Sequence, residues 1–374
     1  MRIPAFAELS REQEGVYFLP LKGHHLIAGP PGTGKTSVAM HRAQYYENAG
    51  HRVRLLTFGN LLKQFMIAGD DSGDLVLEDT TFQTFHSWMH SFWRRQFPNV
   101  RLPIPPGDPY GFVWNEILPI VGNAKNLQDE APNLIIDEGQ DLPPEFYQFV
   151  QLISRNVTVF ADENQRIIQT QTNLEMIKAS LGLTKIHYLK NNYRNSLEIA
   201  KLASTFYTGL KTGTPELPDR TSPPPPSYII YKTRAEMFKA ITRFERNNTD
   251  LDIGVFLPYK RLVTNYANKL QDETQNRVQW YVWEDRKAAK LLNFNNPGIK
   301  VTTFNSAKGL EFDAVFIPAV NKIGQMWDPD KSATAMMFYV LISRARDRIE
   351  INQFGTGMSP LANLLQKRVK EANK

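Results

Sequence analysis

A glycine-rich stretch near the N-terminus constrains the fold more than any other part of the sequence. The apolar run His25–Ala28 leads directly into the loop Gly29-Pro30-Pro31-Gly32-Thr33-Gly34-Lys35-Thr36, and a helix-forming stretch, Ser37–Asn48, follows. Strand, loop and helix in this order are the setting in which the pattern G-x-x-x-x-G-K-[ST] surrounds phosphate groups. Glycines let backbone N–H groups turn inward, and the start of the helix adds a partial positive charge. The sequence therefore predicts a nucleoside triphosphate site.

The residues of this loop have expected parts in such a site. Lys35 is expected to reach the β- and γ-phosphates, and the Thr36 hydroxyl to ligate Mg²⁺. The residues predicted to hold the nucleotide here are Gly29, Pro30, Pro31, Gly32, Thr33, Gly34, Lys35, Thr36 and Ser37.

A second apolar run, Asn133–Ile136, ends in the acidic box Asp137-Glu138-Gly139-Gln140-Asp141. A strand that delivers an acid at its C-terminal end suits a second contact to Mg²⁺, and we assign this contact to Asp137. Glu138 is then expected to orient and deprotonate the attacking water, which is the role of a general base. Beside a phosphate loop, this box predicts hydrolysis of the triphosphate.

Short apolar runs recur along the rest of the chain. Continuous rather than alternating hydrophobicity is typical of parallel strands that are covered by helices on both faces. We therefore predict an α/β protein with about five strands in each half. The expected strands are His25–Ala28, Val53–Phe58, Leu134–Ile136, Val157–Ala161 and Lys185–Leu189, then Tyr228–Tyr231, Ile253–Leu257, Lys300–Phe304, Ala314–Ile317 and Ile349–Phe354.

Composition narrows the functional classes. The chain has 374 residues, no cysteine and a net charge of +6. Lack of cysteine excludes disulfides, thiolate zinc sites and iron–sulfur clusters, and it suits a reducing cytoplasm. No apolar run is long enough to span a bilayer, and the N-terminal segment is too short and too soon charged for a signal peptide. We expect a cytoplasmic protein with no membrane contact, and the mild basic excess permits a polyanionic partner.

The acidic box resembles the DEAQD box of the UvrD/Rep group of superfamily 1 helicases. Seven further stretches resemble other boxes of this family in the same order, so the resemblance covers residues 9 to about 350. They are Leu9–Gln13 (Q motif), Leu56–Asn60 (motif Ia), Thr84–Ser87 (motif Ib), Ala161–Gln165 (motif III), Asn192–Arg194 (motif IV), Thr303–Phe312 (motif V) and Val340–Ala345 (motif VI).

The resemblance implies ATP and Mg²⁺ as cofactors, bound in a cleft between two RecA-like P-loop domains. It implies that Gln13 reads the adenine edge, Tyr193 stacks on the adenine and Glu311 approaches the ribose. Besides Lys35 and Glu138, the implied catalytic residues are Gln165 as the γ-phosphate sensor, Arg194 as a phosphate contact and Arg344 as the arginine finger.

Motifs Ia and Ib contact single-stranded nucleic acid in this family, and Asn305 of motif V is assigned to the same nucleic acid. DNA is the favoured track, with RNA left open. Phe58 and Phe85 are the first candidates for base-stacking platforms. The implied strand contacts are Thr57, Phe58, Asn60, Thr84, Phe85, His86 and Asn305.

The segment Trp88–Phe97 interleaves aromatic residues with arginines and has two interpretations. It could extend the strand-binding track, as aromatic and basic residues do in single-strand binders. It could also form an amphipathic helix that buries Trp88, Phe92 and Trp93. The sequence does not choose between them.

We expect an N-terminal domain at residues 1–188, with a small insertion around 88–132, and a C-terminal domain at 189–374. Four consecutive prolines, Pro223–Pro226, mark the stretch 214–227 as a stiff connector, because proline continues neither a helix nor a central strand. The insertions are smaller than in UvrD-type relatives. No aromatic residue occurs between Arg166 and Lys185, where the family carries base-stacking rings.

The sequence is compatible with two functions. The resemblance favours an ATP-dependent single-stranded DNA translocase or helicase with 3′→5′ polarity, working with a protein partner such as a nuclease. The compact insertions and the missing aromatic residues favour an ATPase switch that senses DNA or nucleotide and gates an effector without processive unwinding.

Overall fold

The computed structural model describes residues 3–59, 62–64, 66–67, 75, 77, 81–124, 127, 133–163, 172–209, 213–274, 278–282, 293–324, 327–328 and 330–374. The chain divides into two units. The first unit comprises Arg2–Pro30 and Gly34–Leu189, and the second comprises Pro31–Thr33 and Lys190–Lys374.

The first unit is built on a six-stranded sheet in the order β3-β2-β4-β5-β1-β6. Its pairs are parallel, so their C-terminal ends meet at one edge. The strands are β1 (Gly23–Ala28), β2 (Val53–Thr57), β3 (Phe82–Thr84), β4 (Asn133–Ile136), β5 (Asn156–Ala161) and β6 (His187–Tyr188).

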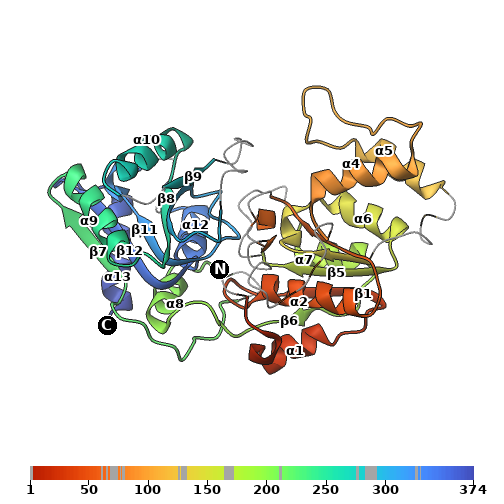
Figure 1. The fold of residues 1–374 in the computed structure, drawn as a ribbon, viewed down its shortest axis with the longest axis horizontal. Helices are drawn as coiled ribbons and strands as arrows, with labels where there is room; N and C mark the ends of the chain where they lie inside the picture. Colours follow the sequence, from red (N-terminus) through yellow and green to blue (C-terminus); the bar gives the residue numbers. More distant parts are fainter. Residues whose placement is uncertain are drawn as a thin grey trace. The chain divides into compact units, whose positions relative to one another are not determined.

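Helices cover both faces of this sheet (Figure 1). They are α1 (Arg11–Tyr17), α2 (Lys35–Asn48), α4 (Phe85–Gln96), α5 (Trp114–Gly122), α6 (Pro144–Ile153) and α7 (Leu174–Ser180). Leu26, Leu56 and Ile136 belong to a buried core that α4 to α7 complete with Trp88, Phe146 and other apolar residues. The alternate strand residues Ile27 and Leu55 are also fully buried, and α2 packs on β2, β4 and β5.

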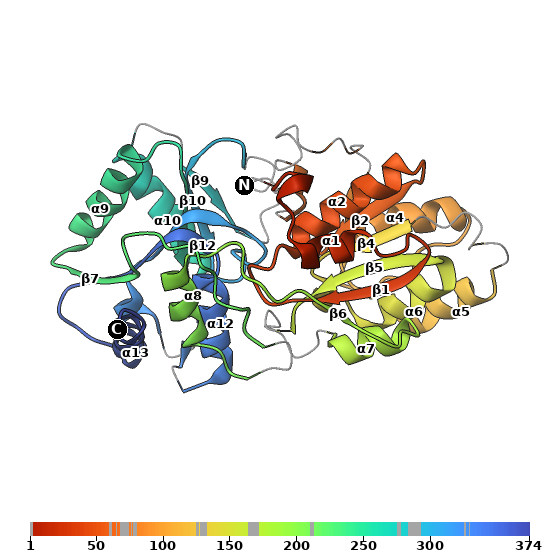
Figure 2. The same ribbon diagram turned by 90° about the horizontal axis from the view of Figure 1, so that it is seen from below.

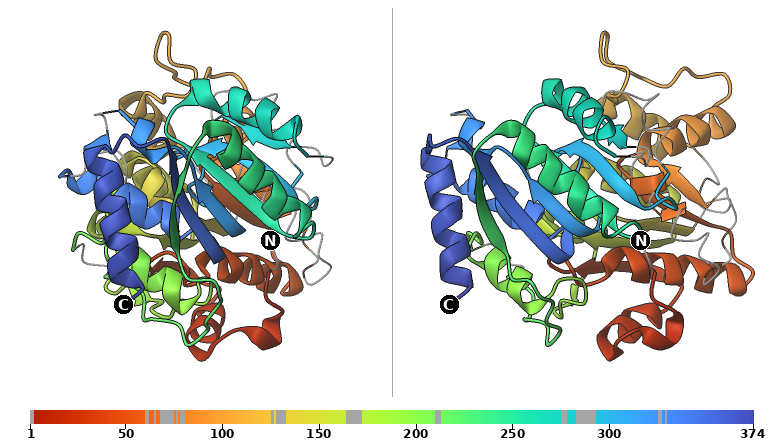
Figure 3. Two further views of the ribbon diagram at one scale, coloured as in Figure 1. Left: turned by 90° about the vertical axis from the view of Figure 1, so that its left-hand side faces the viewer. Right: turned by 60° about the vertical axis from the view of Figure 1, so that its left-hand side comes forward.

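The second unit has a six-stranded sheet in the order β7-β12-β11-β8-β10-β9, again with parallel pairs. Its strands are β7 (Ser227–Tyr231), β8 (Asp252–Leu257), β9 (Gln279–Tyr281), β10 (Gly298–Thr303), β11 (Phe312–Ile317) and β12 (Ala345–Phe354). Figure 2 shows α9 (Arg234–Arg246) and α10 (Lys260–Gln271) on one face of the sheet, and α8 (Leu197–Ser204) and α12 (Ser332–Ile342) on the other. In Figure 3 the sheet lies as a middle layer between α9 and the C-terminal helix α13 (Pro360–Ala372).

The predicted α/β class with parallel sheets is confirmed, and the architecture is that of two RecA-like domains. The sequence missed β3 and β9, because each is three residues long and includes a glutamine. Between Thr214 and Pro226 the proline-rich segment lies within the second unit, between α8 and β7. No helix in the described parts of the chain is long and apolar enough to cross a bilayer.

The amphipathic-helix interpretation of residues 88–97 is the correct one. Helix α4 runs from Phe85 to Gln96, and it buries Trp88, Phe92 and Trp93 in the core of the first unit. Trp88 and Phe92 cannot extend a strand-binding track, because they pack against α6 through Phe149, and Trp93 is buried beside Phe97. The segment that follows α4 forms a long loop before α5, drawn in orange in Figure 1.

Candidate nucleotide site and strand-contact residues

The phosphate loop joins β1 to α2 and has the backbone shape that its glycines predict. Gly32 and Gly34 have φ angles of 89° and 79°, which L-residues with a side chain seldom adopt. A Cβ atom on Gly34 would lie 2.4 Å from Nε2 of Gln13. Both glycines are therefore required by their conformation, and a side chain at Gly34 would also collide with Gln13.

Lys35 begins α2, and its ammonium group lies over the loop. Its Nζ donates to the carbonyl oxygens of Gly29 and Pro30 at 2.7 and 3.1 Å. The Asp162 carboxylate, at the end of β5, lies 3.5 Å from the same nitrogen and is fully buried. The cation is thus held above the loop, where it can meet a phosphate.

Thr36 and Asp137 converge at the same edge of the first sheet. The Thr36 hydroxyl donates to Oδ2 of Asp137 at 2.7 Å. Oδ1 of Asp137 is buried and has no hydrogen-bond partner among the described residues. Burial, and then the neighbouring Glu138 carboxylate, raise the pKa of Asp137 to about 7. A hydroxyl oxygen beside an unpartnered carboxylate oxygen fits a hard cation such as Mg²⁺, which binds oxygen ligands.

Glu138 has an unusual backbone and a defined side-chain partner. Its φ and ψ are 53° and 43°, in the left-handed region. Its Oε2 accepts a hydrogen bond from Nε2 of Gln140 at 2.6 Å. Oε1 of Gln140 accepts in turn from the Asp162 backbone N–H at 2.9 Å. Gln140 therefore links the predicted base to the strand end that carries the partner of Lys35.

Gln13 lies beside the phosphate loop within the first unit. Its Oε1 accepts from the Ser10 backbone N–H at 3.0 Å, in a capping box at the start of α1. Its Nε2 is the atom that excludes a Cβ from Gly34. The predicted reader of the adenine edge is therefore buried, and its amide is oriented by the helix it caps.

Three of the predicted nucleotide residues of the second unit, Arg194, Glu311 and Arg344, lie close together beside the start of β12. Arg194 forms an ion pair with Glu311 and donates to the Ser343 carbonyl at 3.3 Å. Burial raises the pKa of Glu311, but the positive charges of Arg194 and Arg344 outweigh burial and leave this pKa below its usual value.

Two of the predicted nucleotide residues of this unit differ in exposure. Arg344 is buried, and it donates to the carbonyls of Val340 and Leu310 at 3.2 and 3.4 Å. Tyr193 is 44% exposed. Its ring is therefore accessible to a ligand, whereas the Arg344 guanidinium is held inside its own unit.

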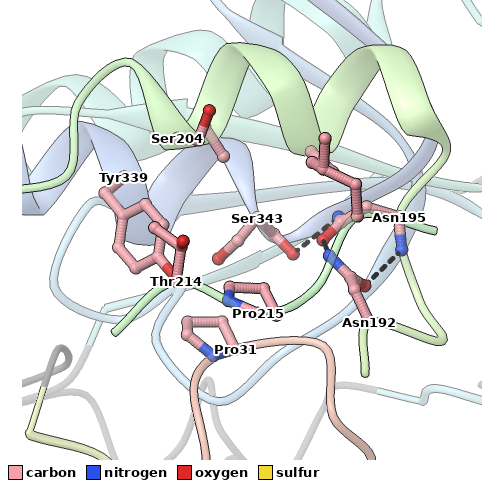
Figure 4. Close-up of a pocket in the computed structure, with 11 residues that line it drawn as sticks. Pro31, Asn192, Asn195, Ser204, Thr214, Pro215, Tyr339 and Ser343 are labelled. Atoms are coloured by element: carbon pink, nitrogen blue, oxygen red, sulfur yellow. Dashed lines mark hydrogen bonds between the residues drawn. The ribbon is translucent and has the colours of Figure 1, made fainter. Parts of the chain in front are cut away.

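Two asparagines hold motif IV in place (Figure 4). Asn192 donates to Asn195 Oδ1 at 2.9 Å, and Asn195 donates to the Ser343 carbonyl at 3.1 Å. Pro31, Thr214 and Tyr339 line a small pocket beside them. Gly32 is also part of this group: its carbonyl accepts from the Tyr193 N–H at 2.8 Å, and a Cβ on it would lie 2.4 Å from Asn192 Oδ1.

Two of the predicted strand contacts are buried, and the stacking prediction is corrected for Phe85. Thr57, the last residue of β2, is 1% exposed. Phe85 is 2% exposed, and its ring packs 4.8 Å from that of Phe146. A ring that is buried on all sides has no face for a base, so Phe85 is not a stacking platform.

Other predicted strand contacts remain at least partly accessible. Phe58 is half-buried against the core, and Asn305 is exposed. Thr84 is the N-cap of α4, since its hydroxyl accepts from the Ser87 N–H at 3.3 Å. His86 stacks on Phe112, and its Nε2 lies 3.1 Å from the Tyr110 carbonyl oxygen. Asn60 and Gln165 lie outside the described residues.

Sequence reasoning missed three polar residues of this arrangement: Gln140, Asp162 and Asn195. The first two stand inside boxes that were recognised, but no part was assigned to them. Polar residues placed directly after buried strands were the available signal, because strand ends of a parallel sheet meet at one edge.

The comparisons with known proteins agree with a P-loop architecture. Residues 16–171, somewhat less than half of the chain, match a family described as an AAA domain. No curated protein matches the sequence. One solved structure it resembles is the C-terminal domain of a possible DNA helicase from Lactobacillus plantarum WCFS1, with 16% identity and a TM-score of 0.33. That match covers 47% of this chain and 95% of the other. A likeness this weak carries no argument here.

Proposed function

We propose that this chain is an ATP-hydrolysing motor of the UvrD/Rep-like helicase type, which translocates along single-stranded DNA with 3′→5′ polarity. The observation that carries the proposal is the pair Thr36 and Asp137 behind the phosphate loop, with a buried carboxylate oxygen left for a cation. The order of the sequence boxes supports the helicase type. The basic net charge of +6 is compatible with a nucleic acid partner.

The residues of the first unit suit the parts that hydrolysis requires. Thr36 and Asp137 would hold Mg²⁺, and that ion would neutralise the charge on the β- and γ-phosphates. Lys35 would bind the same phosphates, since its ammonium already lies over the loop. Glu138 would accept the proton of the attacking water, and Gln140 would hold the carboxylate in position.

Arg194 and Arg344 are proposed as phosphate contacts of the second unit. An arginine that stabilises a transferring phosphoryl group is worth about 10³–10⁵ in rate. Arg344 would first have to leave the carbonyls of Val340 and Leu310. We propose that this release accompanies nucleotide binding, and that it couples hydrolysis to movement.

A second candidate function follows from the burial of Thr57 and Phe85. Fewer accessible strand contacts favour an ATPase switch that gates a partner such as a nuclease. Displacement of a roadblock from single-stranded DNA separates the two functions, because a switch does not move along its track.

The first experiment is a steady-state ATPase assay with single-stranded DNA, duplex DNA, RNA or no nucleic acid. Lys35→Ala serves as the blank, and Lys239→Ala, an exposed lysine of the second unit, is the matched control. Stimulation by single-stranded DNA in the control but not in the blank supports the motor. A rate that no nucleic acid changes favours the switch, and full activity of Lys35→Ala refutes the phosphate site.

A further inference from the structure

Arg42 is a fully buried arginine in the helix that follows the phosphate loop. Its hydrogen bonds are to backbone carbonyls and one hydroxyl. The guanidinium donates to the carbonyls of Val16, Tyr17, Leu19 and Pro20 at 3.3, 2.9, 2.8 and 2.8 Å, and Nε donates to Thr158 Oγ1 at 3.1 Å. A buried charge needs such partners, because an unpaired one is strongly unfavourable.

The four carbonyls belong to one short stretch, the last turn of α1 and the residues that follow it. A helix leaves its last carbonyls without partners and carries a partial negative charge at that end. The Arg42 guanidinium satisfies these carbonyls and matches their charge. Tyr46, one turn further along α2, adds a hydrogen bond to the Leu21 carbonyl at 2.6 Å. Together the two side chains attach α1 to α2, and the two helices lie side by side in Figure 2.

The opposite end of α1 carries Gln13. Helix α1 has only seven residues, so Gln13 lies less than one turn before the carbonyl of Val16, which Arg42 binds. The Gln13 amide lies against Gly34 of the loop, and its Oε1 accepts from Ser10. An amide oxygen has two lone pairs, and the amide nitrogen has two hydrogens, so this group can also bind a base edge.

We propose that Arg42 is a positioning residue for base recognition: by fixing the C-terminal end of α1 to α2, it holds the Gln13 amide at the phosphate loop, where it selects adenine over guanine. This inference rests on the proposed function, because it assumes a nucleotide bound at the loop. Arg42 itself touches no ligand in this scheme. Its effect passes entirely through the placement of Gln13.

The test is a double-mutant cycle on base preference. Affinities of the non-hydrolysable analogues of ATP and GTP are measured by calorimetry for wild type, Gln13→Ala, Arg42→Lys and the double variant. Lysine keeps the charge, but its three donors on one nitrogen cannot replace the five donors of the planar guanidinium. We expect Arg42→Lys to weaken binding of the ATP analogue by about fivefold, the usual worth of one hydrogen bond, and to leave binding of the GTP analogue unchanged. In the Gln13→Ala background the same change should add no further loss of preference.

Ile177→Ala controls for general destabilisation, because Ile177 is fully buried on α7, apart from α1. It should lower the melting temperature and leave the base preference intact. The inference is overturned if Arg42→Lys weakens both analogues equally, if its effect adds fully to that of Gln13→Ala, or if Gln13→Ala leaves the preference unchanged. Failure of the proposed function is distinguishable, since Lys35→Ala would then bind both analogues as wild type does.

Discussion

Two regions at the C-terminal edge of the first sheet differ in what their side chains contact. One comprises the segments after β1 and β4, and the other comprises the residues at the ends of β2 and β3. After β1 and β4, the side chains of Thr36 and Asp137 meet, and one carboxylate oxygen is left without a partner. At the ends of β2 and β3, Thr57 and Phe85 are buried as well, but the Phe85 ring packs on Phe146 and has no polar partner. All four strands are parallel members of one sheet, so position at the edge does not decide whether a side-chain atom is left for a ligand. The packing of the next helix decides it.

The two helices that start at this edge show why. Helix α2 begins with a glycine loop, and the polar side chains at its start, Lys35 and Thr36, are held by carbonyls of that loop and by Asp137. Helix α4 begins directly at Phe85, and its aromatic residues are drawn into the core with α6. A base-binding ring would therefore have to come from a neighbouring loop, and half-buried Phe58 is the remaining candidate.

The largest expected effect is on the rate of nucleotide hydrolysis, which depends on the region after β4. Glu138→Gln should reduce hydrolysis by about 10²–10⁴-fold, because an amide cannot accept the proton of water. Nucleotide affinity should be retained, since the loop is untouched. Single-turnover hydrolysis and analogue binding measure the two quantities, with Glu145→Gln on α6 as the matched control. Undiminished hydrolysis would remove Glu138 as the base.

The next largest effect tests whether Phe85 is a core residue. Phe85→Ala should lower the free energy of unfolding by about 3–5 kcal/mol, because it deletes a large buried ring. Urea denaturation measures this loss. Affinity for single-stranded DNA should be unchanged in the milder Phe85→Leu variant and reduced in Phe58→Leu. Reduced binding by Phe85→Leu, with normal stability, would show that Phe85 is exposed to the strand after all.

The titration of Asp137 is expected to have a smaller effect. Its pKa of about 7 in the folded protein lies above the ordinary value of 3.8, so the folded state binds this proton more tightly than the unfolded state does. The free energy of unfolding should therefore fall as the pH rises between these values, with a slope on the order of 1 kcal/mol per pH unit, and change no further above them.

Asp137→Asn should remove this contribution. Urea denaturation of both proteins with a chelator present, at about pH 5 and about pH 8, gives the comparison. Identical pH dependence in the two proteins would mean that the wild-type carboxyl is already ionised at low pH.

The smallest effect is expected at Thr84. Thr84→Ala should lower the free energy of unfolding by about 1 kcal/mol, because the N-cap of α4 loses its acceptor. Thr84→Ser retains the hydroxyl and is the control. If Thr84→Ala instead leaves stability intact and weakens binding of single-stranded DNA, the hydroxyl contacts the DNA and does not stabilise the helix.

Residue patterns were sufficient for the parallel sheets, the glycine loop and the acidic box, because each depends on local chemistry. Apolar runs predict strands wherever they are continuous, but β3 and β9 are too short and too polar to stand out. Motif resemblance placed Phe85 against the nucleic-acid strand because it assigns roles by position in a box. It cannot foresee how the next helix packs. The carbonyl partners of Arg42 were equally hidden, since they join α2 to residues more than twenty positions earlier.

The left-handed backbone at Glu138 has a consequence for how the chain can change over time. Glycine would adopt this conformation without the steric cost that a side chain imposes, commonly about 1–3 kcal/mol for such residues. A glycine there would also discard the carboxylate that the proposed chemistry needs. Selection for a sturdier fold and selection for turnover would thus act in opposite directions at one codon. Thermostabilising screens that ignore activity should recover changes at Glu138 early.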